Sequence, residues 1–453
     1  MIEGSPPIPT IDGRRFAWVG RLRANELLMG VARNTGWLLG DRLVRAALGF
    51  LVGAWVARYL GPDRFGHFAY VLAFIAFFQA IANLGADSIV VRDVAREPES
   101  APEILGSILR FRFVAGLVCW AAAVGLMALL DPGNLETVAM TAIIGGVLVF
   151  QAADTVDLWF QSQMQSRRTV VAKLTAYLLT NGLKIVLVLT GAPLIAFAAA
   201  FLFDFAGAAT ALWLAYRRLP TARSWNLDLG RARTLLVQSW PFMLSGLAIV
   251  VYLRIDQLML KALRGNHELG VFAAALPISQ LWQMIPMTLA ISFGPYVAQQ
   301  KRAGEEQYEA ALAMIFRLFG ALAIAAAIVT IVAAPIIVPA VYGPDFAESV
   351  SVLQILVLTN VFMALGVAQT LWVTNEGVGR ILLIQTIFGA AVAITGNIVL
   401  IPRFGAIGAA MAAVAANACA AFLVNMILAP RIFRMQLGLR PAVKPDSAGS
   451  PSE

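Results

Sequence analysis

Residues 34–70, NTGWLLGDRLVRAALGFLVGAWVARYLGPDRFGHFAY, decide the fold. They consist of two apolar segments joined by the short turn GPDRFG at 61–66. A helix needs about 20 mostly apolar residues to cross the hydrocarbon core of a bilayer, and both segments are long enough. We therefore predict a transmembrane helical hairpin. Its first segment carries Asp41, Arg42 and Arg45, and charges in a membrane helix are costly enough to suggest a function.

The composition extends this interpretation to the whole chain. Of 453 residues, 60% are hydrophobic and 13% are charged. In soluble domains about 45–50% of the residues are apolar and about 25% are charged, so the chain has the composition of a membrane protein. We predict an all-α polytopic membrane protein with about 12 transmembrane helices, at residues 35–57, 66–88, 112–130, 138–160, 172–190, 193–215, 240–262, 269–291, 314–340, 350–373, 381–401 and 405–428.

The basic residues are distributed unevenly between the two sides of the membrane. With the N-terminus placed in the cytoplasm, 25 Lys and Arg residues fall in the inner segments and ends, and five fall in the outer turns. Because cytoplasmic loops are enriched in Lys and Arg, we expect both termini in the cytoplasm. The same asymmetry accounts for the net charge of +8, so we expect no nucleic-acid partner.

A repeat relates the two halves of the sequence. GPDRFGHFA at 61–69 aligns without a gap with GNHELGVFA at 265–273, an offset of 204. A second similarity, LW at 158–159 and at 371–372, has an offset of 213. Both place corresponding spans in the same direction. We therefore predict two pseudo-symmetric six-helix lobes around a central cavity, as in transporters built from parallel repeats.

This organisation divides the chain into five parts. They are a cytoplasmic leader at 1–34, an N-terminal lobe at 35–220, a cytoplasmic linker at 221–238, a C-terminal lobe at 239–430 and a cytoplasmic tail at 431–453. The leader mixes Arg with aromatic and Leu residues, which favours a helix lying on an anionic membrane surface. A disordered basic leader is the alternative.

The motifs of common enzymes are absent from the sequence. It contains no GxxxxGK[ST] phosphate loop, no HExxH and no GxSxG. Its two His and two Cys do not cluster with paired acids, so we predict no metal site. We expect neither enzymatic activity nor a cofactor, and instead expect transport driven by an ion gradient or by metabolism of the substrate.

Nine charged residues lie in the predicted spans. The cations are Arg42, Arg45, Lys184 and Arg254, and the carboxylates are Asp41, Asp154, Asp157, Asp204 and Asp256. Asp41 and Arg45 have the i, i+4 spacing of a favourable helical ion pair. Arg254 and Asp256 are two residues apart and point to nearly opposite sides of their helix. Asp154 and Asp157 share a face, which either lines a wet cavity or docks against the cationic spans.

Four stretches resemble one protein family. The hairpin at 34–70, NLGADSIVVRDVAR at 83–96, LWFQSQMQSRR at 158–168 and LRIDQLML at 253–260 resemble the bacterial polysaccharide (O-antigen type) flippases. These belong to the multidrug/oligosaccharidyl-lipid/polysaccharide exporter superfamily. The resemblance covers nearly the whole chain and implies a two-lobed fold with twelve or fourteen spans. Twelve spans fit the polysaccharide branch.

The resemblance implies that the protein flips a polyprenyl-pyrophosphate-linked oligosaccharide from the inner to the outer leaflet of the bacterial inner membrane, by alternating access. Its partners would be this lipid-linked oligosaccharide, membrane lipid and polysaccharide polymerase or export proteins. Guanidinium groups bind diphosphates in a bidentate manner. We therefore predict that pyrophosphate and glycan are bound by Arg42, Arg45, Lys184, Arg254, Gln280, Trp282 and Gln283. The carboxylates would serve ion coupling or charge pairing.

Two other functions fit parts of the sequence. An ion-coupled multidrug or organic-cation exporter of the same superfamily would need exposed carboxylates in one lobe, and Asp154, Asp157 and Asp204 are available. A membrane-embedded glycosyltransferase or polymerase would need long outer loops with catalytic residues. The predicted outer turns are short, which disfavours this second alternative.

Overall fold

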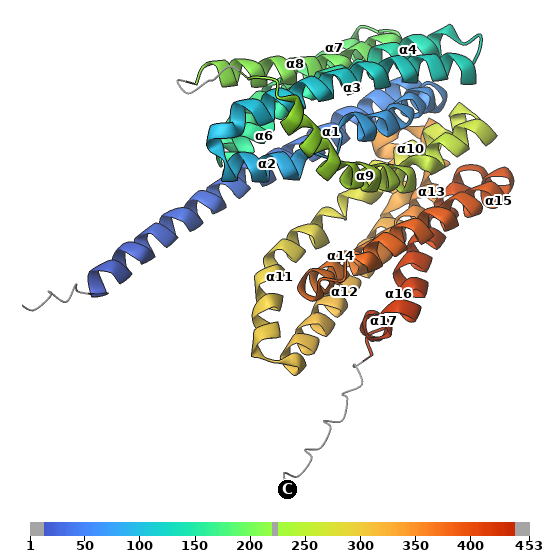
Figure 1. The fold of residues 1–453 in the computed structure, drawn as a ribbon. Coiled ribbons are helices and arrows are strands. Elements are labelled where there is room, and N and C mark those ends of the chain that lie inside the picture. Colours follow the sequence, from blue (N-terminus) through green and yellow to red (C-terminus); the bar gives the residue numbers. More distant parts are fainter. Residues whose placement is uncertain (1–12, 220–224, 440–453) are drawn as a thin grey trace, which may run out of the picture.

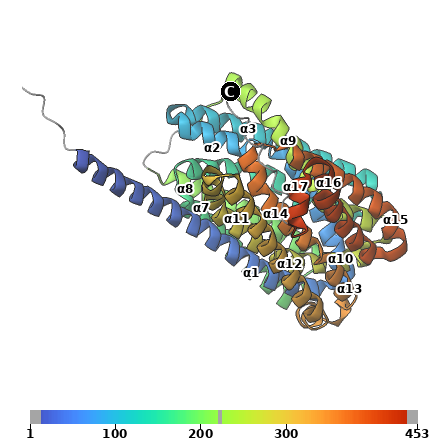
Figure 2. The same cartoon turned by 90° about the horizontal axis from the view of Figure 1, so that it is seen from below.

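The computed structural model describes residues 13–219 and 225–439, and the side chains of 13–35, 38 and 39 lie outside this description. Within the described part, every regular element is a helix. This confirms the predicted all-α class. Figure 1 shows two groups of helices stacked on each other, and in Figures 1 and 2 the first part of α1 extends well beyond the bundle.

The first group contains eight helices in chain order. Their bounds are α1 Gly13–Ala82, α2 Asp87–Arg96, α3 Ala101–Leu130, α4 Leu135–Gly145, α5 Val147–Phe150, α6 Asp154–Ser162, α7 Ser166–Leu189 and α8 Leu194–Arg217. Local chemistry sets several of the boundaries. For example, the Asn134 side chain accepts a hydrogen bond from the Thr137 backbone N–H and so caps the start of α4.

The second group follows after the break at 220–224. Its helices are α9 Leu229–Arg264, α10 Asn266–Leu281, α11 Met284–Ala303, α12 Glu305–Tyr342, α13 Ser349–Leu356, α14 Thr359–Glu376, α15 Arg380–Ala418, α16 Val424–Leu428 and α17 Pro430–Gln436. A single π-helical turn, Cys419–Leu423, joins α15 to α16. Its last spans therefore form one nearly continuous helical path.

Ten helical stretches of the described chain are long and apolar enough to cross a membrane. Two of them, Gly40–Arg96 and Arg380–Leu428, contain a non-helical glycine with positive φ, at Gly61 and Gly405. The chain folds back at each glycine, so each stretch supplies two spans (Figure 1). The twelve predicted spans are confirmed in this way.

The last hairpin is closed by direct contact between its arms. A Cβ atom on Gly408 would lie 2.3 Å from the Leu400 carbonyl oxygen, and one on Gly396 would lie 3.1 Å from the Ala412 Cβ. Only glycine permits so close an approach of one helix backbone to another. The hairpin therefore depends on small residues rather than on polar contacts.

The helix α9 connects the two groups and begins inside the predicted linker. Asp228 caps it by accepting hydrogen bonds from the Gly230 and Arg231 N–H groups. Arg231 then pairs with Glu97 of the first group. Residues 229–238, predicted as part of a cytoplasmic linker, thus form the first turns of a spanning helix docked on the first lobe.

The two lobes meet where the repeated turns lie. Helices α1 and α10 are in contact, and one buried apolar cluster combines Ala54 and Ala57 of α1 with Leu269 and Phe272 of α10. We call this the turn end of the molecule. Away from the turn end, α2 of one lobe and α11 of the other diverge (Figure 1).

Candidate functional site

The predicted ion pair of the first span is present. The Arg45 Nε donates to the Asp41 Oδ1 at 2.8 Å. The Arg45 guanidinium also lies over the Tyr177 ring, 4.7 Å from its centroid, and the Tyr177 hydroxyl donates to the Arg45 carbonyl oxygen at 3.0 Å. Arg45 is therefore held between its own helix and α7, which makes it a rigid cation.

Both carboxylates of α6 dock against a cation. The Lys173 Nζ lies 2.7 Å from an Asp154 oxygen and 2.9 Å from an Asp157 oxygen. Both roles left open for these aspartates are represented, because both pair with Lys173 and Asp154 also lines a cavity. Sequence reasoning placed Lys173 among the inner basic residues and missed this role. Its position seven residues inside α7, about 10 Å along the helix, was the available signal.

A cavity of about 200 Å³ opens beside this cluster. Its lining includes two cations, Arg45 and Lys173, and two carboxylates, Asp154 and Asp204. Asp204 also interacts electrostatically with Lys184 of the neighbouring helix. The opposite charges nearly balance, so this cavity of the first lobe is polar without being strongly cationic.

Three of the predicted cations lack, among the described residues, the close ion pair that Arg45 makes. Within the described residues, Arg42, Lys184 and Arg254 have no carboxylate oxygen within 4 Å. Arg254 makes one long hydrogen bond, 3.5 Å from its Nη1 to the Gln257 Oε1. These three lie on α1, α7 and α9, and α1 packs on both of the other helices. They retain the capacity to bind an anion.

A second polar cavity, of about 70 Å³, lies in the second lobe. It is lined by Asp256, Gln280, Gln283, Asn397 and Asn417, among others. The Asp256 Oδ1 accepts from the Gln257 N–H at 2.7 Å. Sequence reasoning missed the two asparagines, although amides in the otherwise apolar spans 11 and 12 were a readable signal.

Asn397 is a buried polar residue of this cavity. It is 1% exposed, and its Oδ1 has no hydrogen-bond partner in the described structure. A buried oxygen without a donor is costly. Asn397 and Asp256 both line this cavity.

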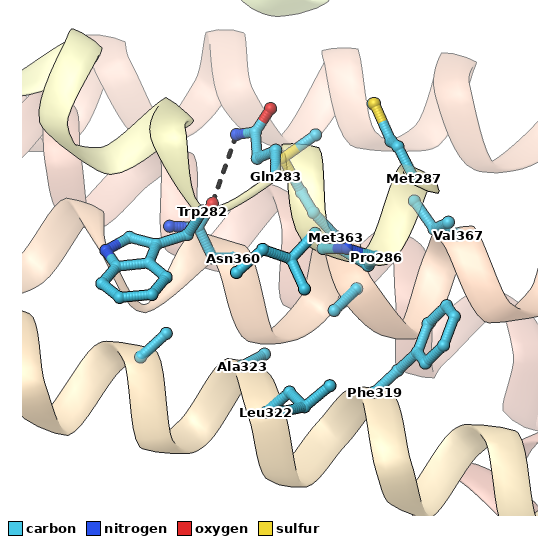
Figure 3. Close-up of a pocket in the computed structure, with 13 residues that line it drawn as sticks. Trp282, Gln283, Pro286, Met287, Phe319, Leu322, Ala323, Asn360, Met363 and Val367 are labelled. Atoms are coloured by element: carbon cyan, nitrogen blue, oxygen red, sulfur yellow. Dashed lines mark hydrogen bonds between the residues drawn. The ribbon is translucent and has the colours of Figure 1, made fainter. Parts of the chain in front are cut away.

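Trp282 and Gln283 occupy the break between α10 and α11 (Figure 3). The Trp282 Nε1 donates to the Thr330 Oγ1 at 2.8 Å, and the Gln283 Nε2 donates to the Asn360 Oδ1 at 3.2 Å. Both side chains line a narrow apolar pocket with Phe319. Their hydrogen bonds are thus made within the lobe.

The predicted site residues therefore form two groups. Asp41, Arg45, Asp154, Asp157 and Asp204 gather in the first lobe, and Asp256, Gln280, Trp282 and Gln283 gather in the second. Neither of the two polar cavities described above is lined by residues of both groups.

The sequence matches two family models. The model of the polysaccharide biosynthesis protein family matches residues 31–301, and the MatE model matches residues 241–399. A comparison with curated proteins gives no match.

Solved structures of transporters share the fold at low sequence identity. An inward-facing multidrug resistance MATE family transporter of the MOP superfamily has a TM-score of 0.67 at 17% identity, covering 86% of this chain and 96% of its own. The lipid II flippase MurJ, in an inward closed conformation, has a TM-score of 0.67 at 13% identity, covering 88% and 89%. An outward-facing MATE transporter has a TM-score of 0.60 at 19% identity, covering 90% and 96%.

These similarities agree with the twelve spans and the two lobes. Identities this low establish the fold, whereas the match over residues 31–301 spans more than half of the chain. The chain belongs to the polysaccharide biosynthesis protein family and has the fold of the MOP-superfamily transporters.

Proposed function

We propose that the protein flips a polyprenyl-pyrophosphate-linked oligosaccharide from the inner to the outer leaflet, for polysaccharide export, by alternating access. The observation that carries this proposal is that three spanning cations of a family member, Arg42, Lys184 and Arg254, have no carboxylate oxygen of the described residues within 4 Å. A diphosphate that crosses hydrocarbon needs such partners, because an unpaired charge there is very costly.

The cations would act in sequence on the headgroup. With Arg42 near the inner end of the predicted first span, 35–57, and Lys184 and Arg254 deeper in their spans, the pyrophosphate would meet a new cation as it advances. Guanidinium groups offer bidentate hydrogen bonds to phosphate oxygens. Arg45, already braced by Asp41, contributes charge without having to move. Gln280, Trp282 and Gln283 would face the glycan when the second lobe repacks.

Asp256 is the proposed coupling group. It shares the cavity of the second lobe with the unpartnered oxygen of Asn397, so a proton or another small cation bound there would neutralise the carboxylate. Asp41, by contrast, is occupied by Arg45. An inside-negative potential adds about 2.3 kcal/mol per charge per 100 mV to movement of net charge, so the charge state of Asp256 affects the direction of transport.

The orientation of the chain is part of the proposal. The excess of 25 inner over five outer basic residues supports cytoplasmic termini in a bacterial inner membrane. The turn end then faces outward, and the lobes are closed on the outer side. This is the conformation that loads a substrate from the inner leaflet, where polymerase and export proteins of the outer side cannot yet reach it.

Substitution of Arg42 and of Arg254 tests this proposal. Hydrogen bonds to a charged group contribute about 1.5–3 kcal/mol, so Arg254→Ala or Arg42→Ala should weaken binding of polyprenyl pyrophosphate about tenfold or more. Binding to the purified full chain can be measured by native mass spectrometry. Arg403→Ala, an exposed cation of an outer turn, is the control and should bind as the wild type does. Equal binding by all three variants would refute the assignment.

One observation favours a second function, export of an amphiphilic organic cation. The cavity containing Asp256 and the apolar pocket beside Trp282 share Gln283 and Met363, so a carboxylate adjoins an apolar surface. The aspartates of the first lobe fit this function less well, because Asp154 and Asp157 share an ion pair with Lys173. Uptake of a fluorescent lipophilic cation into inverted vesicles, abolished by Asp256→Asn, would support the exporter.

A further inference from the structure

Two glycines bring the repeated turns into direct contact. A Cβ atom on Gly66 would lie 1.9 Å from the Asn266 carbonyl oxygen, and one on Gly270 would lie 1.9 Å from the Pro62 carbonyl oxygen. Real Cβ atoms essentially never come within 3.0 Å of another heavy atom that is not bonded nearby. Backbone therefore touches backbone at these two glycines, and neither position has room for a side chain.

The contact is reciprocal under the repeat. Residue 266 is residue 62 plus the offset of 204, and residue 270 is residue 66 plus the same offset. The contact of Gly66 with residue 266 and the contact of Gly270 with residue 62 are therefore the same contact, exchanged between the two repeats. Contacts are exchanged in this way in an interface on a two-fold axis. The pair formed by Asp63 and His267, with 3.3 Å between the Asp63 Oδ2 and the His267 Nδ1, obeys the same offset. The pseudo-two-fold axis therefore passes through these turns.

Side chains below the glycines also cross between the lobes. Phe65 lies edge-on to Phe346, with ring centroids 6.2 Å apart, and Phe50 lies edge-on to Tyr342 at 6.5 Å. Phe346 and Tyr342 are almost fully buried by this packing. Such a layer can form only while the turns above it are in contact, because the rings reach across from α1.

We propose that Gly66 and Gly270 are positioning residues for the transport cycle, which together form a latch that closes the turn end. The inference rests on the alternating access of the proposed function but on neither its substrate nor its direction. Each lobe has a buried cluster away from the latch, around Phe160 in the first and Phe316 in the second, so an added methyl group should separate the lobes while leaving each lobe folded. Closing the turn end, rather than folding, is what requires glycine here.

Distances across the turn end test the latch. Leu135 and Arg403 are exposed and lie beside the two turns, since Thr137 bonds His67 at 2.8 Å and the Ala406 N–H bonds Glu268 at 2.7 Å. Spin labels on cysteines at 135 and 403, in the full chain lacking Cys119 and Cys419, report the separation of the lobes by double electron–electron resonance.

The predicted result is a loss of the short-distance population. Overpacking costs about 1–3 kcal/mol, so Gly66→Ala or Gly270→Ala should lower the ratio of closed to open molecules about tenfold. Both residues belong to one contact, so the double variant should be much less than additive. Gly53→Ala, with nothing within 4 Å of its Cβ position, is the matched control and should behave as the wild type does. Unchanged distances in both glycine variants, with normal folding, would overturn the latch.

A cross-link provides the complementary test if either variant fails to fold. A short thiol-specific reagent should cross-link the cysteines of an Asp63→Cys, His267→Cys variant in high yield. The cross-link should keep positions 135 and 403 at the short distance and stop transport until it is cleaved. Failure to cross-link, or an open distance in the cross-linked protein, would contradict the latch. Because yield and distance need no substrate, an incorrect flippase assignment would leave both results intact.

Discussion

Ion pairing separates the charged residues of the spans into two kinds. Arg45 is paired with Asp41 inside α1, and Lys173 with Asp154 and Asp157 between α7 and α6, so the charges of these cations serve the fold. Arg42, Lys184 and Arg254 have no carboxylate oxygen within 4 Å in the described chain, and we propose that they bind the anionic headgroup. The i, i+4 spacing predicted the first pair. The pairs of Lys173 join residues 16 and 19 positions away, and only the packing of α6 on α7 brings them together.

Replacement of Lys173 tests whether its ion pairs with Asp154 and Asp157 stabilise the fold. Lys173→Met should lower the free energy of unfolding by about 1–3 kcal/mol, less than for a fully buried pair because Lys173 is 25% exposed. Thermal unfolding in detergent, followed by tryptophan fluorescence, measures the loss.

Neutral residues at positions 154 and 157 should restore the stability that Lys173→Met loses. Asp154→Asn with Asp157→Asn in the Lys173→Met background removes the two uncompensated carboxylates and should restore most of the lost stability. If the triple variant unfolded at the same temperature as Lys173→Met alone, the ion cluster would not be the source of the effect.

At the scale of elements, helix contacts depend on glycines at specific positions. Gly408 lets the arms of the last hairpin touch, and Gly85 lets the turn before α2 approach the Met243 backbone of α9, where a Cβ would lie 2.4 Å from the Met243 nitrogen. The second contact, with the pair of Arg231 and Glu97, fixes the first part of α9 on the first lobe. Sequence analysis predicted a linker there because both contacts join residues more than 130 positions apart.

Substitution of one hairpin glycine tests this dependence. Gly408→Ala places a methyl group against the Leu400 carbonyl and should destabilise the hairpin by about 1–3 kcal/mol, seen as a lower unfolding temperature. Gly366→Ala, which has open space at its Cβ position, is the control and should be neutral or slightly stabilising. Equal unfolding temperatures for both variants would contradict the close packing of the arms.

At the scale of the whole molecule, the repeat explains why the lobes close as they do. The offset of 204 at GPDRFG predicted two lobes of the same topology, and the two copies meet at the turn end. Hydrophobic segments predicted all twelve spans, because membrane helices must satisfy their own backbone. The predicted lobe boundaries assign each site residue to a lobe, but which side chains share a cavity was not predictable, since the facing direction of Trp282 and Asp256 depends on long-range packing.

The most direct test of the central claim is a flipping assay with the full chain in proteoliposomes. A polyprenyl-pyrophosphate-linked oligosaccharide is placed in both leaflets, and a membrane-impermeant glycosidase digests the glycan exposed outside. The wild-type protein should make the inner pool accessible with time, and Arg254→Ala should slow this about tenfold or more. If wild-type vesicles released no more glycan than protein-free vesicles, while the same vesicles accumulated a lipophilic cation, the flippase function would be contradicted.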